Sequence, residues 1–138
     1  MIRKRSARAL AGGLAVVLLL VAASSAYAFV TGSFSGTTGQ QQSISFHVGH
    51  GKVTKLQFRI RDVCPNGKMY VIHDFGFPFI KINTKHKFDG KFKSTNTNAQ
   101  VEITGTVQSK QVKGKLAEIR TIKGSRCVGL AKYTVHKQ

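Results

Sequence analysis

The stretch ISFHVGHGKVTKLQFRIRDVC, residues 44–64, decides the fold. Every second residue of 44–48 is apolar, and the same alternation returns in 55–61, where Leu56, Phe58 and Ile60 are separated by polar residues. A period of two is the signature of a strand with one buried face. The residues between the two segments, Gly-His-Gly, favour a tight hairpin. The stretch therefore predicts two amphipathic antiparallel strands.

The alternation recurs along the rest of the chain, and helical spacing is almost absent. Further strands are expected at 69–74, 101–107, 112–116 and 127–135, and an irregular edge strand is expected over 75–82 because Pro78 cannot donate to a ladder. The fold class that we predict is all-β: a single antiparallel domain of about eight strands, built as a β-sandwich or an up-and-down meander barrel. Interrupted alternation predicts bulges at Val53 and between Leu116 and Ile119.

The N-terminus has the layout of a secretory signal peptide. Basic residues precede an uncharged apolar run of 15 residues, Ala9 to Ala23, and small residues then end in an A-x-A pattern at Ala26 and Ala28. An uncleaved anchor is the alternative, but a membrane-spanning helix needs roughly 20 apolar residues. We therefore expect 1–28 to be a signal peptide and 29–138 a secreted β domain, extracellular or associated with the cell wall, with no transmembrane segment after cleavage.

The predicted mature chain contains two cysteines, Cys64 and Cys127. Secretion takes a protein out of the reducing cytosol, so an intramolecular disulfide is the expected state of this pair. Cys64 shares the parity of Leu56, Phe58 and Ile60, which places its thiol on the core side of the strand. A cross-link also suits a domain of this size, whose single core is modest.

Lysines occupy only odd positions in KINTKHKFDGKFK, residues 81–93: Lys81, Lys85, Lys87, Lys91 and Lys93. A continuous strand would turn the phenylalanines inward and all these lysines outward. A two-residue hairpin at Asp89 and Gly90 would destroy that segregation, whereas a three-residue loop over 88–90 would keep the lysines on one face. The pattern favours the longer loop. The five lysines are either a binding surface or the solvated face of a strand.

The charge of the whole chain bears on this choice. Four of the 22 lysines and arginines lie in the predicted signal peptide, which leaves 18 against five acidic residues. Folding does not require such an imbalance, and self-repulsion opposes it. An anionic partner is the physical inference: cell-wall teichoic acid, acidic polysaccharide, an anionic cell surface or, less favoured, nucleic acid.

Other candidate sites are weaker. Phe75, Phe77 and Phe79 share one parity and could form a platform for sugars or bases, although a core face is the more economical reading. His47 and His50 lack a nearby third ligand, so we expect no metal and no cofactor. The carboxylates, Asp62, Asp74, Asp89, Glu102 and Glu118, are scattered along the chain, and no serine lies in a nucleophile elbow. We therefore do not expect an enzyme, although distant strands could bring two carboxylates together.

Short glycine-centred motifs occur in a fixed order: GSFSGTT at 32–38, ISF at 44–46, GKV at 51–53, FDGKF at 88–92, ITG at 103–105, GKL at 114–116 and CVG at 127–129. In this order they resemble small secreted proteins of actinobacterial type that have no assigned function. The resemblance covers most of residues 29–138. It implies a secreted β domain with paired cysteines and transfers no active site. Tyr133 stands where a tryptophan would be expected.

These observations predict a monomeric, disulfide-linked domain that binds an anionic extracellular polymer through Lys81, Lys85, Lys87, Lys91 and Lys93. Two alternatives remain open. One is a lipocalin-like barrel that carries a small apolar ligand in a cavity lined by Phe46, Phe58 and Tyr133. The other is a cationic structural or antimicrobial protein.

Overall fold

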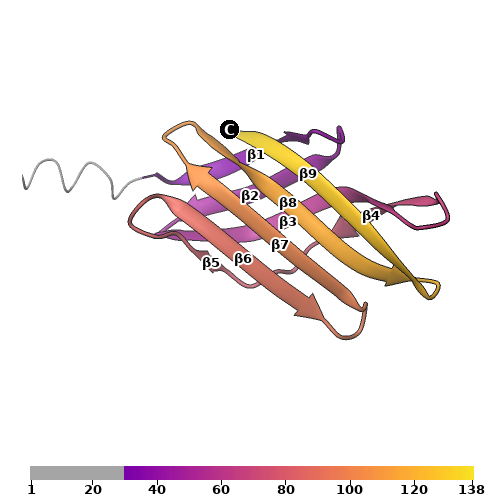
Figure 1. Cartoon of the computed structure of the whole chain (residues 1–138). Coiled ribbons are helices and arrows are strands. Elements are labelled where there is room, and N and C mark those ends of the chain that lie inside the picture. The colour runs from indigo at the N-terminus through magenta and orange to yellow at the C-terminus, as the bar shows by residue number, and fades with distance from the viewer. Residues whose placement is uncertain (1–29) are drawn as a thin grey trace, which may run out of the picture.

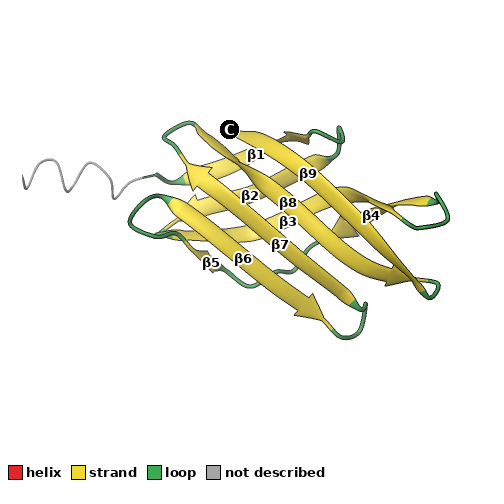
Figure 2. Cartoon of the chain, viewed as in Figure 1, coloured by secondary structure: helices red, strands yellow, loops and turns green. Residues whose placement is uncertain are grey.

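A computed structural model describes residues 30–138 of the protein (Figure 1). The described chain forms nine strands: β1 Gly32–Thr38, β2 Ser43–Gly49, β3 Lys52–Val63, β4 Met69–Asp74, β5 Ile80–Lys81, β6 Lys87–Ser94, β7 Ala99–Val107, β8 Gln111–Ile122 and β9 Ser125–Lys137. Between residues 30 and 138 there are only strands and loops, and no helix that could cross a membrane (Figure 2). The predicted cleavage site at Ala26 and Ala28 lies outside the described residues.

All nine strands belong to one antiparallel sheet, which confirms the predicted fold class. The order β4-β3-β2-β1-β9-β8-β7-β6 makes each half of the chain a meander, and β1 joins the two halves by pairing with the last strand, β9. In Figure 1 the β6–β9 half lies in front of the β1–β4 half. The sheet therefore folds over on itself into two layers that share one core.

The core consists of the inward side chains of both layers. The β1–β5 layer contributes Phe34, Ile44, Phe46, Val48, Val53, Leu56, Phe58, Ile60 and Ile80. The β6–β9 layer contributes Phe88, Val101, Ile103, Val107, Val112, Leu116, Tyr133 and Val135. These are the apolar residues that recur with a period of two in the sequence, so the predicted parities hold for most strands.

The predicted hairpin between β2 and β3 is confirmed. Its two loop residues, His50 and Gly51, have φ values of 52° and 70°. A positive φ at both positions is the geometry that two-residue hairpin loops prefer. The bulge expected near Val53 is also present: the pairing register of β2 and β3 shifts by one residue beside Lys55, which itself has a φ of 53°.

The second expected bulge is absent from the described β8. Its pairing with β7 and β9 runs without interruption from Val112 to Arg120. The inward parity of Val112 and Leu116 simply continues through Glu118, which is fully buried, to Arg120. The apparent change of phase comes from charged residues that occupy core positions.

A seam closes one end of the fold, where β3 meets β9 directly. Val63 pairs with Val128, and the next residues outward, Cys64 and Cys127, form the predicted disulfide. Gly129 permits this approach, because a Cβ atom there would come within 2.9 Å of the Arg61 carbonyl oxygen and would also meet Asp62. Only a residue without a side chain fits between the two strands at this point.

Gln40, in the β1–β2 loop, fills the gap where β3 and β9 begin to converge. Its side-chain oxygen accepts a hydrogen bond from the Arg61 backbone N–H at 2.8 Å. Its Nε2 donates to the carbonyl oxygens of Arg61 at 3.1 Å and Leu130 at 3.2 Å. One amide side chain thus satisfies backbone groups of both strands and holds them in register beside the seam.

The ring of Tyr133, on β9, lies over a pair of glycines on the neighbouring strands β8 and β7. Gly105 and Gly114 are directly opposed on β7 and β8, and a Cβ on either would lie 2.7 Å from the Tyr133 hydroxyl. That hydroxyl donates to the Thr104 carbonyl oxygen at 2.7 Å. The two glycines make room for a buried ring whose polar end finds a backbone partner.

We predict that Gly114→Ala destabilises the fold by roughly 2 kcal/mol or more, since overpacking of this kind typically costs about 1–3 kcal/mol. The added methyl would meet the Thr104 carbonyl group, which is backbone and cannot rotate away. Chemical denaturation measures the free energy of unfolding. Gly39→Ala is the matched control, because its Cβ would have only the Lys132 carbonyl oxygen nearby, at 3.7 Å. Equal stability of the two variants would contradict the prediction.

Candidate functional site

The five lysines of the predicted site are all exposed, but they lie on three different elements. Lys81 is in β5 and Lys85 in the following turn, whereas Lys87, Lys91 and Lys93 lie on the outward side of β6. The structure therefore brings together three of the five on one strand face.

The predicted three-residue loop over 88–90 is wrong, because β6 runs straight through this segment. Gly90 points into the core, where a Cβ would come within 2.6 Å of the Ile80 side chain. The turn lies earlier, at 83–86, and the Asn83 side chain builds it by accepting hydrogen bonds from the backbone N–H groups of Lys85 and Lys87, both at 2.9 Å. Gly90 serves close packing rather than a turn.

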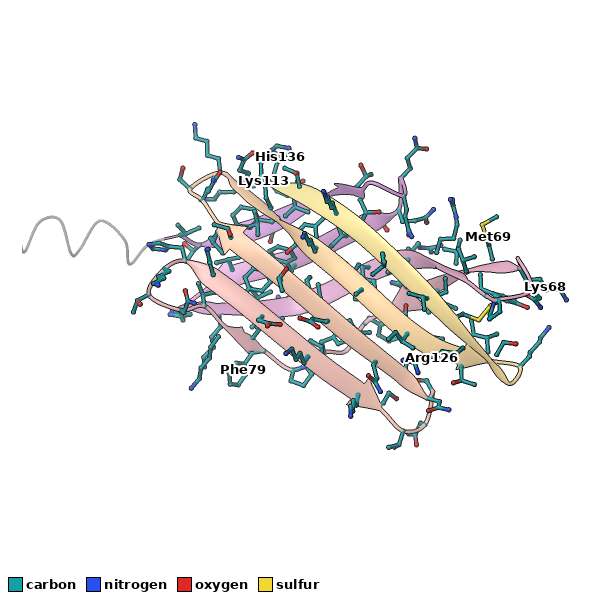
Figure 3. All side chains as sticks on the ribbon, in the orientation of Figure 1. Lys68, Met69, Phe79, Lys113, Arg126 and His136 are labelled. Carbon is teal, nitrogen blue, oxygen red and sulfur yellow. A yellow bond between two sulfur atoms is a disulfide. The ribbon has the colours of Figure 1, made fainter. Side chains whose placement is uncertain are left out.

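Further lysines continue the cationic surface across the same layer. In the register of the sheet, Lys87 is followed by Thr106 of β7 and Lys113 of β8. The next row on the same face of the sheet contains Asp89, Thr104, Lys115 and Lys132. We call the following set the lysine face: Lys87, Lys91, Lys93, Lys113, Lys115 and Lys132. Figure 3 shows Lys113 at one end of this layer.

A shallow groove crosses the lysine face between β6 and β8. Four lysines line it, Lys81, Lys87, Lys113 and Lys115, together with the hydroxyl-bearing Thr104 and Thr106 and one carboxylate, Asp89. Within residues 30–138, the ion pairs closer than 4.0 Å all involve Arg120, so no lysine of this face has a carboxylate partner at that distance. Two carboxylates nevertheless lie on this face: Glu102 is directly opposite Lys91 in the β6–β7 register, and Asp89 lies between Lys87 and Lys91 on β6.

A buried charged cluster lies between the two layers, and sequence reasoning missed it. Asp62 of β3 and Glu118 of β8 are fully buried, and Asp74 and Arg120 are nearly so, with side-chain exposures of 15% and 12%. Three of the five carboxylates of the chain therefore gather inside the fold. The available signal was parity, because Asp62 lies between Ile60 and Cys64 on the inward side.

Arg120 is the cation of this cluster. Its Nε donates to Glu118 Oε1 at 2.8 Å, and its NH2 group donates to Asp74 Oδ1 at 2.7 Å. Both oxygens of Asp62 and one oxygen each of Asp74 and Glu118 have no hydrogen-bond partner among the described protein atoms. One guanidinium cannot neutralise three carboxylates, so the cluster favours protonated acids.

The pKa values follow this arrangement. Burial is the largest effect on Asp62 and raises its pKa to about 7, with Arg120 lowering it and Asp74 raising it further. Burial also dominates at Glu118, whose pKa rises to about 8 with added repulsion from Asp62 and Asp74. The desolvated carboxyls hold their protons near neutral pH.

The three phenylalanines at 75–79 do not share one environment. Phe77 packs against the core, with its ring 5.5 Å from that of Phe58 and 4.9 Å from that of Phe92. Phe75 and Phe79 are 71% and 52% exposed. The segment is irregular up to the two-residue β5, as Pro78 predicted, so the core-face reading is correct only for Phe77.

The three residues that were expected to line a ligand cavity, Phe46, Phe58 and Tyr133, are buried and lie beside other aromatic rings. The ring of Phe46 lies 6.0 Å from Phe88 and 6.3 Å from Tyr133, and Phe58 stacks on Phe77. Within residues 30–138, no three or more His, Cys, Asp or Glu residues are grouped so that they could hold a metal ion.

Comparison with known proteins adds no relative: no protein-family model, no curated protein and no solved structure matches the chain.

We predict that the protein loses stability as pH rises from about 4 through 8. Between these limits the folded state binds more protons than the unfolded state, because the pKa values of Asp62 and Glu118 are raised, and the free energy of unfolding must then fall with pH. For Asp62, a pKa of about 7 instead of 3.8 corresponds to roughly 4 kcal/mol at full ionisation.

Thermal unfolding between pH 5 and pH 9 measures this dependence. Asp62→Asn cannot ionise, so its profile should be flatter and the variant should be more stable than the wild type at the alkaline end. Asp89→Asn is the control, since this carboxylate is exposed on β6 and should leave the profile unchanged. If the stability of Asp62→Asn fell with pH as steeply as that of the wild type, Asp62 would not be a source of the pH dependence.

Proposed function

We propose that the protein is a secreted, monomeric binding domain that attaches to a linear anionic polymer outside the cell through the lysine face. The observation that supports this most is the separation of charge. Residues 30–138 contain 18 lysines and arginines and five carboxylates, but Arg120 and three of the carboxylates are turned inward. The outer surface of residues 30–138 therefore carries 17 lysines and arginines and two side-chain carboxylates, Asp89 and Glu102.

The spacing of the lysine face suits an extended polyanion. Neighbouring strands lie about 4.8 Å apart, so Lys87 and Lys113, which are separated by β7, stand roughly 10 Å apart at their backbones. A chain of phosphate or carboxylate groups that follows the groove meets lysines from β6 and β8 in turn. Thr104 and Thr106, on the strand between, add hydroxyl groups that can donate to the same oxygens.

Lys81 and Lys85 extend this surface at one end. Lys81 lines the groove beside Lys87, and Lys85 is held in the adjoining turn by Asn83. All five lysines of the sequence prediction thus have a place in the proposal, which adds Lys113, Lys115 and Lys132 from strands farther along the chain.

Among anionic partners, wall teichoic acid or an acidic polysaccharide is favoured over nucleic acid. Proteins that bind single-stranded nucleic acid combine cations with aromatic rings on which bases stack. The rings of β6 do not form such a platform, because Phe88 is buried in the core and Phe92 packs against it. The exposed ring beside Lys91 and Lys93 is that of Phe75, which lines a hollow with them, and one ring is too few for successive bases. The disulfide suits an oxidising compartment and so supports the extracellular location that we propose.

The test compares two variants with the same change of charge. We expect Lys87→Gln, Lys91→Gln, Lys113→Gln and Lys115→Gln together to weaken binding to immobilised teichoic acid or acidic polysaccharide by roughly tenfold or more, with a shallower dependence on salt. The control carries Lys68→Gln, Lys110→Gln, Lys123→Gln and Lys137→Gln, which replace exposed lysines outside the lysine face. It should bind nearly as the wild type does.

Two results would contradict the proposal. Equal losses in both variants would mean that net charge alone attracts the polymer. Absence of wild-type binding at physiological salt to every polymer tested, with duplex DNA included for comparison, would leave the lysines as a solvated sheet face.

A further inference from the structure

Large apolar side chains are exposed together on the outer side of the seam. Five residues from β3, β4 and β9 make up this seam patch, with exposed fractions of 47% for Val63, 62% for Met69, 50% for Val71, 38% for Val128 and 67% for Leu130. Single exposed apolar residues need no explanation, but a contiguous group of them marks an interaction surface.

The pairing register shows that the five residues are contiguous. Val63 pairs with Met69 on one side and with Val128 on the other, so these three form a row across the seam. In the adjoining row Val71 pairs with Arg61, and the Gln40 amide contacts the backbone oxygens of both Arg61 and Leu130. The apolar surface thus spans three strands.

Cations surround the seam patch. Arg61 lies within it, and Lys68, Lys123, Arg126 and Lys132 flank it on the two adjacent hairpins and on β9. Figure 3 shows Lys68 and Met69 at the far end of the β3–β4 hairpin.

Most carboxylates of residues 30–138 lie away from the seam patch. Asp62, between Arg61 and Val63, points inward, and so does Glu118. Of the two outer carboxylates, Asp89 lies on β6, and Glu102 is separated from Leu130 by Ala117 of β8. The patch therefore has an apolar centre and a border in which cations outnumber carboxylates, with Glu102 lining the same hollow as Leu130 and Lys132.

We propose that the seam patch docks on the surface of an anionic lipid bilayer. Aliphatic side chains partition into the headgroup region, while lysine and arginine beside them approach lipid phosphates. The β3–β4 and β8–β9 hairpins extend at the same end of the molecule, which lets the patch meet a broad surface (Figure 1). A second copy of the chain is a poor occupant, because it would bring two cationic borders together. Lys132 alone belongs both to this border and to the lysine face, and the inference does not require the lysine face to bind a polymer.

The chain contains no tryptophan, so a single introduced indole reports on one position. Met69→Trp places the probe in the seam patch, and Phe79→Trp places it at another exposed apolar site, on the segment before β5. The protein without residues 1–28 is mixed with vesicles of phosphatidylcholine alone or of phosphatidylcholine with phosphatidylglycerol. We expect a blue shift of Met69→Trp emission with the anionic vesicles and none for Phe79→Trp.

A second measurement isolates the apolar contacts. Met69→Ser with Leu130→Ser should weaken co-sedimentation with the anionic vesicles roughly tenfold or more at unchanged net charge, since each substitution removes an aliphatic group from the contact. Phe79→Ser should not weaken it. Melting temperatures close to that of the wild type would show that the exposed substitutions leave the fold intact.

Three results would overturn the inference. No shift of Met69→Trp with anionic vesicles would exclude insertion of the patch. Equal shifts at both probe positions would mean unoriented adsorption of a cationic protein. A shift with soluble polyglutamate but not with vesicles would make an acidic polypeptide the partner. None of these outcomes bears on the binding of polysaccharide by the lysine face, which the lysine variants test separately.

Discussion

The approach of β3 to β9 at Gly129 is the constraint on which this end of the protein depends, both for its buried charged cluster and for its exposed seam patch. Because Gly129 has no side chain, the backbone of β3 comes close enough for Val63 to pair with Val128. The disulfide and the Gln40 side chain hold the strands there. Alternation along β3 then has two results at once: it places Asp62 inside, beside the charges of β8, and the apolar Val63 outside.

Charged groups are divided between the interior and the outside of this fold. Three carboxylates and one arginine lie in the interior, where burial raises the pKa values of two of the acids, and the outside is left with far more cations than carboxylates. Exposed lysines cost little, since water solvates each ammonium group. Ionising the buried acids would be expensive unless each found a partner. The same arrangement therefore ties stability to pH and makes the exterior attractive to anions.

Sequence reasoning found most of the sheet and only part of the candidate site. Strands, the His50–Gly51 hairpin and the disulfide follow from a period of two, turn residues and two cysteines in a predicted secreted chain. The errors have one origin: inward positions were expected to be apolar. Glu118 and Arg120 were therefore read as a change of phase, although the ladder continues through them. Gly90 was read as part of a turn, although it makes room for Ile80.

By itself the sequence determined the all-β class, the inward and outward sides of most strands and the net positive charge. Alternation can be read from adjacent residues, and net charge follows from the number of charged residues. Only the tertiary structure decided which strands face each other. It brought Asp62 and Asp74 to Glu118 and Arg120, aligned the lysines of β6 with those of β8, and joined Val63 to Val128. Such contacts depend on how the sheet folds over and on where a glycine allows two backbones to meet, and no local pattern encodes either.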